Sequence, residues 1–114
     1  MLKKADYCGS VSGNKVDKKG VFSVSVGKSG APIIDESPLT LDCVVDNVYE
    51  IDGFENFICK IVSTYVDEKY LTENKKSIDY RKLKPVLFEF PTYEYLSTGE
   101  VIGKCLSFSK EDKK

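Results

Sequence analysis

Two β-rich segments joined by Asp52-Gly53 constrain the fold more than any other part of the chain. Residues 39–45 read Leu-Thr-Leu-Asp-Cys-Val-Val, in which apolar residues recur at every second position, and the pattern continues through Ile51. This is the period of a half-buried strand. Residues 57–66 are rich in branched and aromatic side chains, which suit a pleated surface, and Asp-Gly is a favoured two-residue hairpin turn. The sequence therefore predicts an antiparallel hairpin over residues 39–66.

The remaining segments predict a mainly β fold with short helices. No internal repeat, low-complexity tract or linker divides the 114 residues, so we expect one domain over 1–114 with its own buried core and a solvated tail at 107–114. Before the hairpin we expect one or two helical turns at 3–11, a short strand or the end of a second helix at 21–26, and a loop at 27–32. After it we expect a capped helical turn at 77–83 ended by Pro85 and a short strand at 86–90. A tyrosine-rich loop from Tyr93 should then lead into a closing strand that runs through Leu106.

Charge and hydropathy exclude several classes of partner. Seventeen basic and eighteen acidic residues give a net charge of −1, which removes the usual electrostatic case for binding nucleic acid or an anionic membrane. No apolar run approaches the roughly 20 residues needed to span a bilayer. Because polar residues follow Met1-Leu2-Lys3-Lys4 at once, we expect no secretory leader and a cytoplasmic location.

The side chains available for chemistry are few. The chain has no histidine, which excludes histidine-based acid–base catalysis, Ser-His-Asp and Cys-His nucleophiles, and the zinc sites that include histidine. The four cysteines are far apart and form no Cys-x-x-Cys pair, so we expect reduced, mostly buried thiols and no metal site; Cys8 alone lies in a polar segment. Redox or group-transfer chemistry would require a bound cofactor.

Residues 5–18, Ala-Asp-Tyr-Cys-Gly-Ser-Val-Ser-Gly-Asn-Lys-Val-Asp-Lys, combine small hydroxyls, two glycines, an amide and two lysines. A turn at Gly13-Asn14 would expose successive backbone N–H groups, which can form an anion-binding nest beside Lys15 and Lys18. An ordinary helix C-cap followed by solvated lysines explains the same residues. Gly27-Lys28-Ser29 is not a phosphate-binding P-loop, because Phe22 stands where that motif needs its first glycine.

Several segments, taken in order, resemble the flavin reductase-like family of FMN-binding split barrels, which includes flavoredoxin and NAD(P)H:flavin oxidoreductases. Residues 5–18 resemble the family's small-residue segment ending in Ser-Gly-x-x-x-Asp-Lys. Further resemblances are Ala-Pro-Ile-Ile-Asp-Glu-Ser at 31–37 with Leu-Asp-Cys at 41–43, the strand at 56–66, Leu-Lys-Pro-Val at 83–86, and the Tyr-Glu-Tyr-Leu-Ser-Thr-Gly-Glu-Val-Ile-Gly run at 93–103. The resemblance covers nearly the whole chain.

The resemblance implies an antiparallel split β-barrel that forms a homodimer and binds FMN non-covalently near the subunit interface. It also implies electron transfer from NAD(P)H through the flavin to a redox partner protein or small acceptor. No side chain is expected to be catalytic beyond those that position FMN. Carried over to this sequence, the expected FMN phosphate or ribityl contacts are Ser12, Asn14, Lys15 and Lys18, with Asp17 fixing the loop, while Tyr93 and Tyr95 reach the flavin or the dimer contact.

The length of the chain leaves a second functional reading open. Domains of this family are longer, so the match is expected to be their C-terminal portion, without the N-terminal segments that hold part of the flavin. The alternative to a flavin-dependent oxidoreductase is therefore a non-catalytic, truncated split-barrel module that acts in dimerisation or partner binding.

Overall fold

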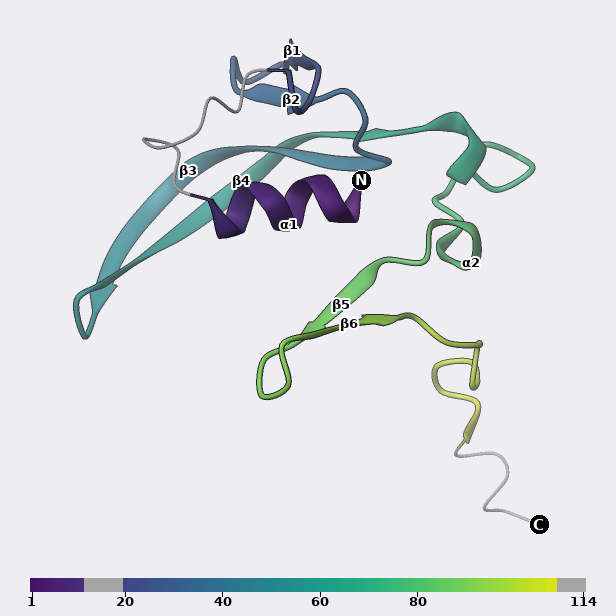
Figure 1. The fold of residues 1–114 in the computed structure, drawn as a ribbon. Helices are drawn as coiled ribbons and strands as arrows, with labels where there is room; N and C mark the ends of the chain where they lie inside the picture. The colour runs from purple at the N-terminus through teal and green to yellow at the C-terminus, as the bar shows by residue number, and fades with distance from the viewer. Residues whose placement is uncertain (12–19, 109–114) are drawn as a thin grey trace.

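A computed structural model describes residues 1–11 and 20–108 and shows a mainly β chain with short helices (Figure 1). Its strands form three two-stranded antiparallel sheets, each a hairpin of consecutive strands. In chain order the elements are α1 (Leu2–Ser10), β1 (Val24–Val26), β2 (Pro32–Ile34), β3 (Leu39–Ile51), β4 (Phe54–Val66), the 3₁₀ turn η1 (Glu68–Tyr70), α2 (Tyr80–Leu83), β5 (Val86–Glu89) and β6 (Glu94–Ser97).

The predicted long hairpin is confirmed. Strands β3 and β4 are 13 residues each and pair from Leu39↔Val66 to Ile51↔Phe54, so the turn is Asp52-Gly53. Both turn residues have positive φ, 50° and 81°, which is the backbone that a type I′ hairpin turn requires and that Asp-Gly tolerates. The pairing contains two bulges, one opposite Asp42/Cys43 and one at Val45/Asn47.

The β1–β2 hairpin is attached to one side of the long hairpin through Asp42. The backbone N–H of Ser29 donates to Asp42 Oδ2 at 3.0 Å, and the Ser29 hydroxyl donates to Asp42 Oδ1. Asp42 is the one buried polar side chain among the described residues, at 3% exposure. The Ser29 hydroxyl, together with the backbone N–H groups of Ser29 and Lys28, lowers the pKa of this carboxyl below its usual 3.8. The loop therefore depends on an ionised carboxylate.

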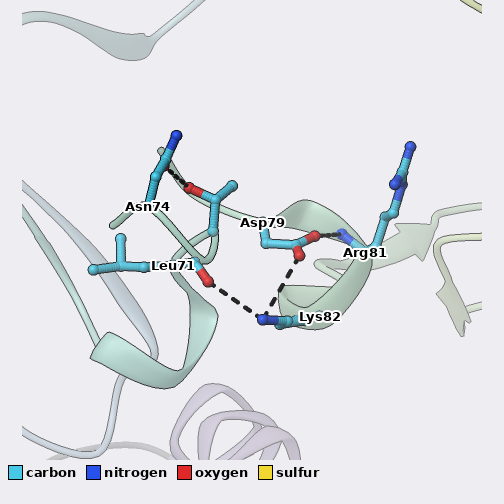
Figure 2. Close-up of polar contacts among 6 residues, drawn as sticks. Leu71, Asn74, Asp79, Arg81 and Lys82 are labelled. Carbon is cyan, nitrogen blue, oxygen red and sulfur yellow. Dashed lines mark hydrogen bonds and ion pairs between the residues drawn. The ribbon is translucent and has the colours of Figure 1, made fainter. Parts of the chain in front are cut away.

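The charged segment between β4 and β5 is held together locally (Figure 2). Asp79 caps α2 by accepting from the backbone N–H of Arg81 at 3.0 Å, which confirms the predicted capped helical turn. Lys82 Nζ donates to the Leu71 carbonyl at 3.4 Å and lies 3.9 Å from Asp79 Oδ2. The helix ends at Leu83, with Lys84 in the left-handed region just before Pro85.

The end of the fold differs from the prediction. The tyrosine-rich segment is itself a strand, because β6 folds back on β5 through the turn at 90–93, where Tyr93 has a φ of 56°. The predicted closing strand through Leu106 is absent: residues 98–106 pair with no strand in the described part of the chain, and Leu106 has a φ of 63°. The sequence indicated the β propensity of this region but not the strand with which it pairs.

The expectation of a self-contained core is wrong for the described residues. None of their hydrophobic side chains is buried. The radius of gyration is 18.5 Å, against about 13 Å for a compact domain of this length. The cysteines follow the same trend: Cys8 and Cys43 are half-buried and Cys59 and Cys105 are exposed, so the prediction of mostly buried thiols is wrong as well.

Two further findings concern ligands and membranes. Within residues 1–11 and 20–108, no cluster of three or more Cys, Asp or Glu side chains is arranged to hold a metal ion. The helices in the same ranges are all too short or too polar to span a bilayer.

Candidate functional site: an aromatic cavity beside α1

A cavity of about 620 Å³ lies between α1 and the β5–β6 hairpin. Its walls are mainly apolar, and its size is within the range of small-molecule and cofactor sites. The lining residues are Leu2, Ala5, Asp6, Gly9 and Ser10 from α1 and Phe88, Tyr93 and Tyr95 from the hairpin.

One face of α1 forms the first wall. Residues 2, 5, 6, 9 and 10 follow the i, i+3, i+4, i+7, i+8 spacing of a single helical face. With Ala5 and Gly9 at its centre, this face has little side-chain bulk, which leaves space between the helix backbone and the hairpin. The sequence analysis predicted helical turns at 3–11 but did not indicate which face of the helix lines the cavity.

Three aromatic rings from β5, β6 and the turn between them form the opposite wall, and Phe90 packs beside them. Phe88 on β5 is the register partner of Tyr95 on β6, and their ring centroids are 5.5 Å apart. Tyr93 lies 6.1 Å from Phe88 and 5.3 Å from Phe90. Because these distances and tilted orientations are favourable for aromatic pairs, the rings support one another. A flat apolar ligand could pack against them.

A single hydrogen bond joins the two walls. The Tyr95 hydroxyl donates to Asp6 Oδ1 at 2.6 Å across 89 positions of sequence. This bond to Asp6, together with desolvation and the charge of the same carboxylate, raises the pKa of Tyr95 above its usual 10. The Tyr95 oxygen keeps lone pairs that can accept from a ligand N–H or O–H, and Asp6 fixes where that oxygen lies.

The structure brings together two of the predicted site residues, Tyr93 and Tyr95. The other five, Ser12, Asn14, Lys15, Asp17 and Lys18, lie outside the described residues. They follow directly in sequence after Ser10, which lines the cavity. The sequence analysis did not select Leu2, Asp6, Gly9 or Phe88. The helical spacing of Leu2, Ala5, Asp6 and Gly9 could have indicated the α1 residues, but it carries no signal for Phe88 on β5.

The Gly27–Ser29 turn is occupied by the protein's own acceptors. Lys28 N–H donates to the Tyr65 hydroxyl at 3.1 Å, Gly27 N–H to the Ala31 carbonyl at 2.8 Å, and Ser29 N–H to Asp42. These amides are therefore committed to holding the loop, in agreement with its interpretation as a connecting loop.

Fold and cavity together define a small antiparallel β protein with an aromatic-walled ligand cavity, and comparison with known proteins identifies the family. A model of the flavin reductase like domain matches residues 1–97. The chain belongs to the flavin reductase-like family. No curated protein sequence matches the chain significantly.

Two solved structures show the same fold. The flavoredoxin of Methanosarcina acetivorans is 39% identical, with a TM-score of 0.85 over 97% of this chain and 59% of that one. The flavoredoxin of Desulfovibrio vulgaris (Miyazaki F) is 29% identical, with a TM-score of 0.79 over 95% of this chain and 58% of that one. The chain thus spans about three-fifths of the length of the flavoredoxins it matches. These likenesses confirm the predicted mainly β, split-barrel type of fold, although the described strands form separate sheets and not a closed barrel.

Proposed function

We propose that this chain is the FMN-binding part of a flavin-dependent oxidoreductase of the flavin reductase type. The observation that carries the proposal is the aromatic cavity between α1 and β5–β6, found in a chain of this family. Its apolar, ring-lined walls suit the flat isoalloxazine ring of a flavin, and its volume suits a group of that size.

The residues of the chain divide between two ends of the cofactor. Phe88, Tyr93 and Tyr95 would pack along the ring system, and the Tyr95 hydroxyl, fixed by Asp6, would accept a hydrogen bond from a polar group at its edge. The FMN phosphate is assigned to the segment after α1, through Ser12, Asn14, Lys15 and Lys18, with Asp17 fixing the loop. A dianionic phosphate favours such a combination of hydroxyl, amide and cationic groups.

Bound FMN would supply the electron transfer that no side chain of this chain can perform alone. NAD(P)H is the proposed electron donor, and a redox partner protein or small molecule is the proposed acceptor. The role of the chain is to hold the flavin, to shield one of its faces from water with aromatic rings, and to fix one polar contact. We also propose a homodimer and a cytoplasmic location.

Titration with FMN tests this function. Saturable quenching of flavin fluorescence, and a visible absorbance band retained after gel filtration, are the expected results. Tyr49→Ala provides the control for Tyr93→Ala, because Tyr49 is also an exposed tyrosine but lies on the long hairpin and does not line the cavity. If Tyr93→Ala binds FMN as tightly as the unaltered chain does, flavin does not bind in this cavity.

One observation favours the alternative function, a non-catalytic module for dimerisation or partner binding. The described residues expose most of their large apolar side chains and bury none. A chain that forms a stable assembly while leaving FMN fluorescence unchanged would support this alternative.

A further inference from the structure

One side of the long β3–β4 hairpin is a continuous apolar surface. Cα partners in a sheet point to the same side, and successive residues alternate, so the register assigns each side chain to a face. The two bulges keep the pairs Leu39↔Val66, Leu41↔Thr64, Cys43↔Ile61, Val45↔Cys59 and Val48↔Phe57 on one side. We call these ten residues the apolar hairpin face; nine of them are apolar or cysteine. The same side ends at the turn with the charged pair Glu50↔Glu55, which bounds the apolar hairpin face.

The opposite side of the hairpin is different. It carries the pairs Thr40↔Tyr65, Asp42↔Ser63, Val44↔Lys60, Asn47↔Ile58 and Tyr49↔Asn56, in which polar residues outnumber apolar ones, and it ends at the turn with the apolar pair Ile51↔Phe54. This side is also the one that the β1–β2 loop covers, because Ser29 bonds to Asp42 and Lys28 to Tyr65. The hairpin is therefore two-sided, and the side without covering loop is the apolar one.

The apolar hairpin face is open to solvent. Phe57 is 56% exposed, Ile61 59% and Val45 53%. At a rise of about 3.3 Å per residue, the apolar hairpin face extends over more than twenty ångströms of strand. A contiguous exposed apolar surface of this extent is typical of the inner side of a β protein and not of an ordinary solvated surface. Both outer edges of the hairpin are also unpaired in the described part of the chain, since its sheet has only two strands.

The occupant follows from the length comparison. The Methanosarcina acetivorans flavoredoxin has the same fold over 97% of this chain, yet about two-fifths of its own length has no counterpart here. A polypeptide equivalent to that remainder would supply apolar side chains and strand edges, and in the flavoredoxin it belongs to the same chain as the matched fold. This comparison favours the remainder of the domain over a second copy.

We propose that the apolar hairpin face docks a polypeptide equivalent to the two-fifths of the flavoredoxin domain that lies outside the match. The contact would be formed by apolar side chains over Phe57, Ile61 and Val45 and by backbone pairing at the edges of β3 or β4. It does not depend on flavin, so it can fail or succeed separately from the proposed function.

Complementation tests the proposal. The 114-residue chain is produced alone and together with a second polypeptide consisting of the Methanosarcina acetivorans flavoredoxin residues outside the match. We expect an equimolar complex by native mass spectrometry and light scattering. If the chain alone is recovered only as aggregate, co-production should make it soluble; chain that stays aggregated, or stays uncomplexed, in the presence of the second polypeptide contradicts the proposal.

Two cysteines provide a readout of the docked face. Cys59 belongs to the apolar hairpin face, whereas Cys105 lies beyond β6, and both are exposed. Complex formation should slow alkylation of Cys59 by about tenfold or more while leaving Cys105 unchanged, followed by peptide mass spectrometry. Equal labelling of Cys59 with and without the second polypeptide would overturn the assignment.

A matched pair of variants locates the contact. Ile61→Asp places a charge on the apolar hairpin face, and Ile58→Asp places the same charge on the opposite side of the same strand. Ile61→Asp should prevent the complex and Ile58→Asp should preserve it. A discrete homodimer of the chain alone, with Cys59 protected and dissociated by Ile61→Asp, would instead identify a second copy as the occupant and refute the proposal.

Discussion

The Tyr95 hydroxyl donates to Asp6 Oδ1 at 2.6 Å and so ties the strand near one end of the described chain to the helix at the other. This contact closes one side of the cavity in which we propose that FMN binds. It fixes the edge of the aromatic wall relative to α1, and its removal should therefore affect both the position of the helix and the binding of the flavin.

Variants of Tyr95 and Asp6 test how this contact affects the helix and how it affects flavin binding. Tyr95→Phe keeps the ring against Phe88 but removes the hydroxyl, and Asp6→Asn keeps a hydrogen-bond acceptor but removes the charge. We expect both variants to loosen α1, seen as faster amide exchange in residues 2–10, with a smaller loss of FMN affinity for Asp6→Asn. Unchanged exchange in Tyr95→Phe would show that other contacts hold the helix.

Alkaline pH should release the same contact. The pKa of Tyr95 is raised by its bond to Asp6, so the stabilisation is fully present below the ordinary tyrosine value of 10 and is lost as the pH rises through the higher value in the folded chain. Ultraviolet titration of tyrosinate, compared between the unaltered chain and Tyr95→Phe, should show that the pKa of Tyr95 lies above 10, and Asp6→Asn should lower that pKa.

The aromatic wall should contribute to flavin affinity through stacking. Tyr93→Ala removes a ring that contacts Phe88 and Phe90, and we expect FMN to bind about 0.5–1.5 kcal/mol more weakly, or roughly two- to tenfold. The fluorescence titration measures this loss, with Tyr49→Ala as the control. A loss of equal size in both variants would indicate a general effect on folding.

The phosphate assignment is tested by charge and hydroxyl removal after α1. Ser12→Ala and Lys15→Ala should each weaken FMN binding by about 1–3 kcal/mol, the range for a charge-assisted hydrogen bond. Riboflavin, which lacks the phosphate, should bind equally to both variants and to the unaltered chain. Lys76→Ala, in the segment between β4 and β5, is the control for a general loss of positive charge. Unaltered FMN affinity in Ser12→Ala and Lys15→Ala would show that the segment after α1 does not bind the phosphate.

Acid pH should destabilise the β1–β2 loop, and so should a side chain added at Gly27. The pKa of Asp42 is lowered mainly by the Ser29 hydroxyl. The stabilisation of the loop by the Asp42 carboxylate is therefore present above the ordinary pKa of 3.8 and is lost as the pH falls through the lower pKa in the folded chain.

A Cβ on Gly27 would lie 2.7 Å from Asp42 Oδ2, so Gly27→Ala should destabilise the chain by on the order of 1–3 kcal/mol. Gly99→Ala, where a Cβ would meet nothing within 4 Å, should have little effect in the same denaturation experiment.

The sequence predicted local structure well where the determinants were local. Asp52-Gly53 indicated the turn, alternation indicated β3, branched and aromatic residues indicated β4, and Pro85 indicated where α2 ends. Sequence reasoning failed where a distant partner decides. It placed β6 in a loop because the strand status of Glu94–Ser97 comes from pairing with Val86–Glu89.

The residues of the candidate site were likewise predicted only in part. Tyr93 and Tyr95 were selected from the family resemblance, and the structure brings both to the cavity. Asp6 was not selected because its importance comes from Tyr95, 89 positions away. The expected core was wrong for the described residues because apolar composition does not reveal whether apolar side chains pack against one another within the chain.

FMN titration tests the central claim most directly. It is performed on the chain alone and on the equimolar complex with the complementing polypeptide, for the unaltered sequence and for Tyr93→Ala and Tyr49→Ala. We predict saturable binding with a visible flavin absorbance band, weakened by Tyr93→Ala and unchanged by Tyr49→Ala. Colourless protein that leaves FMN fluorescence unchanged in both forms would contradict the account.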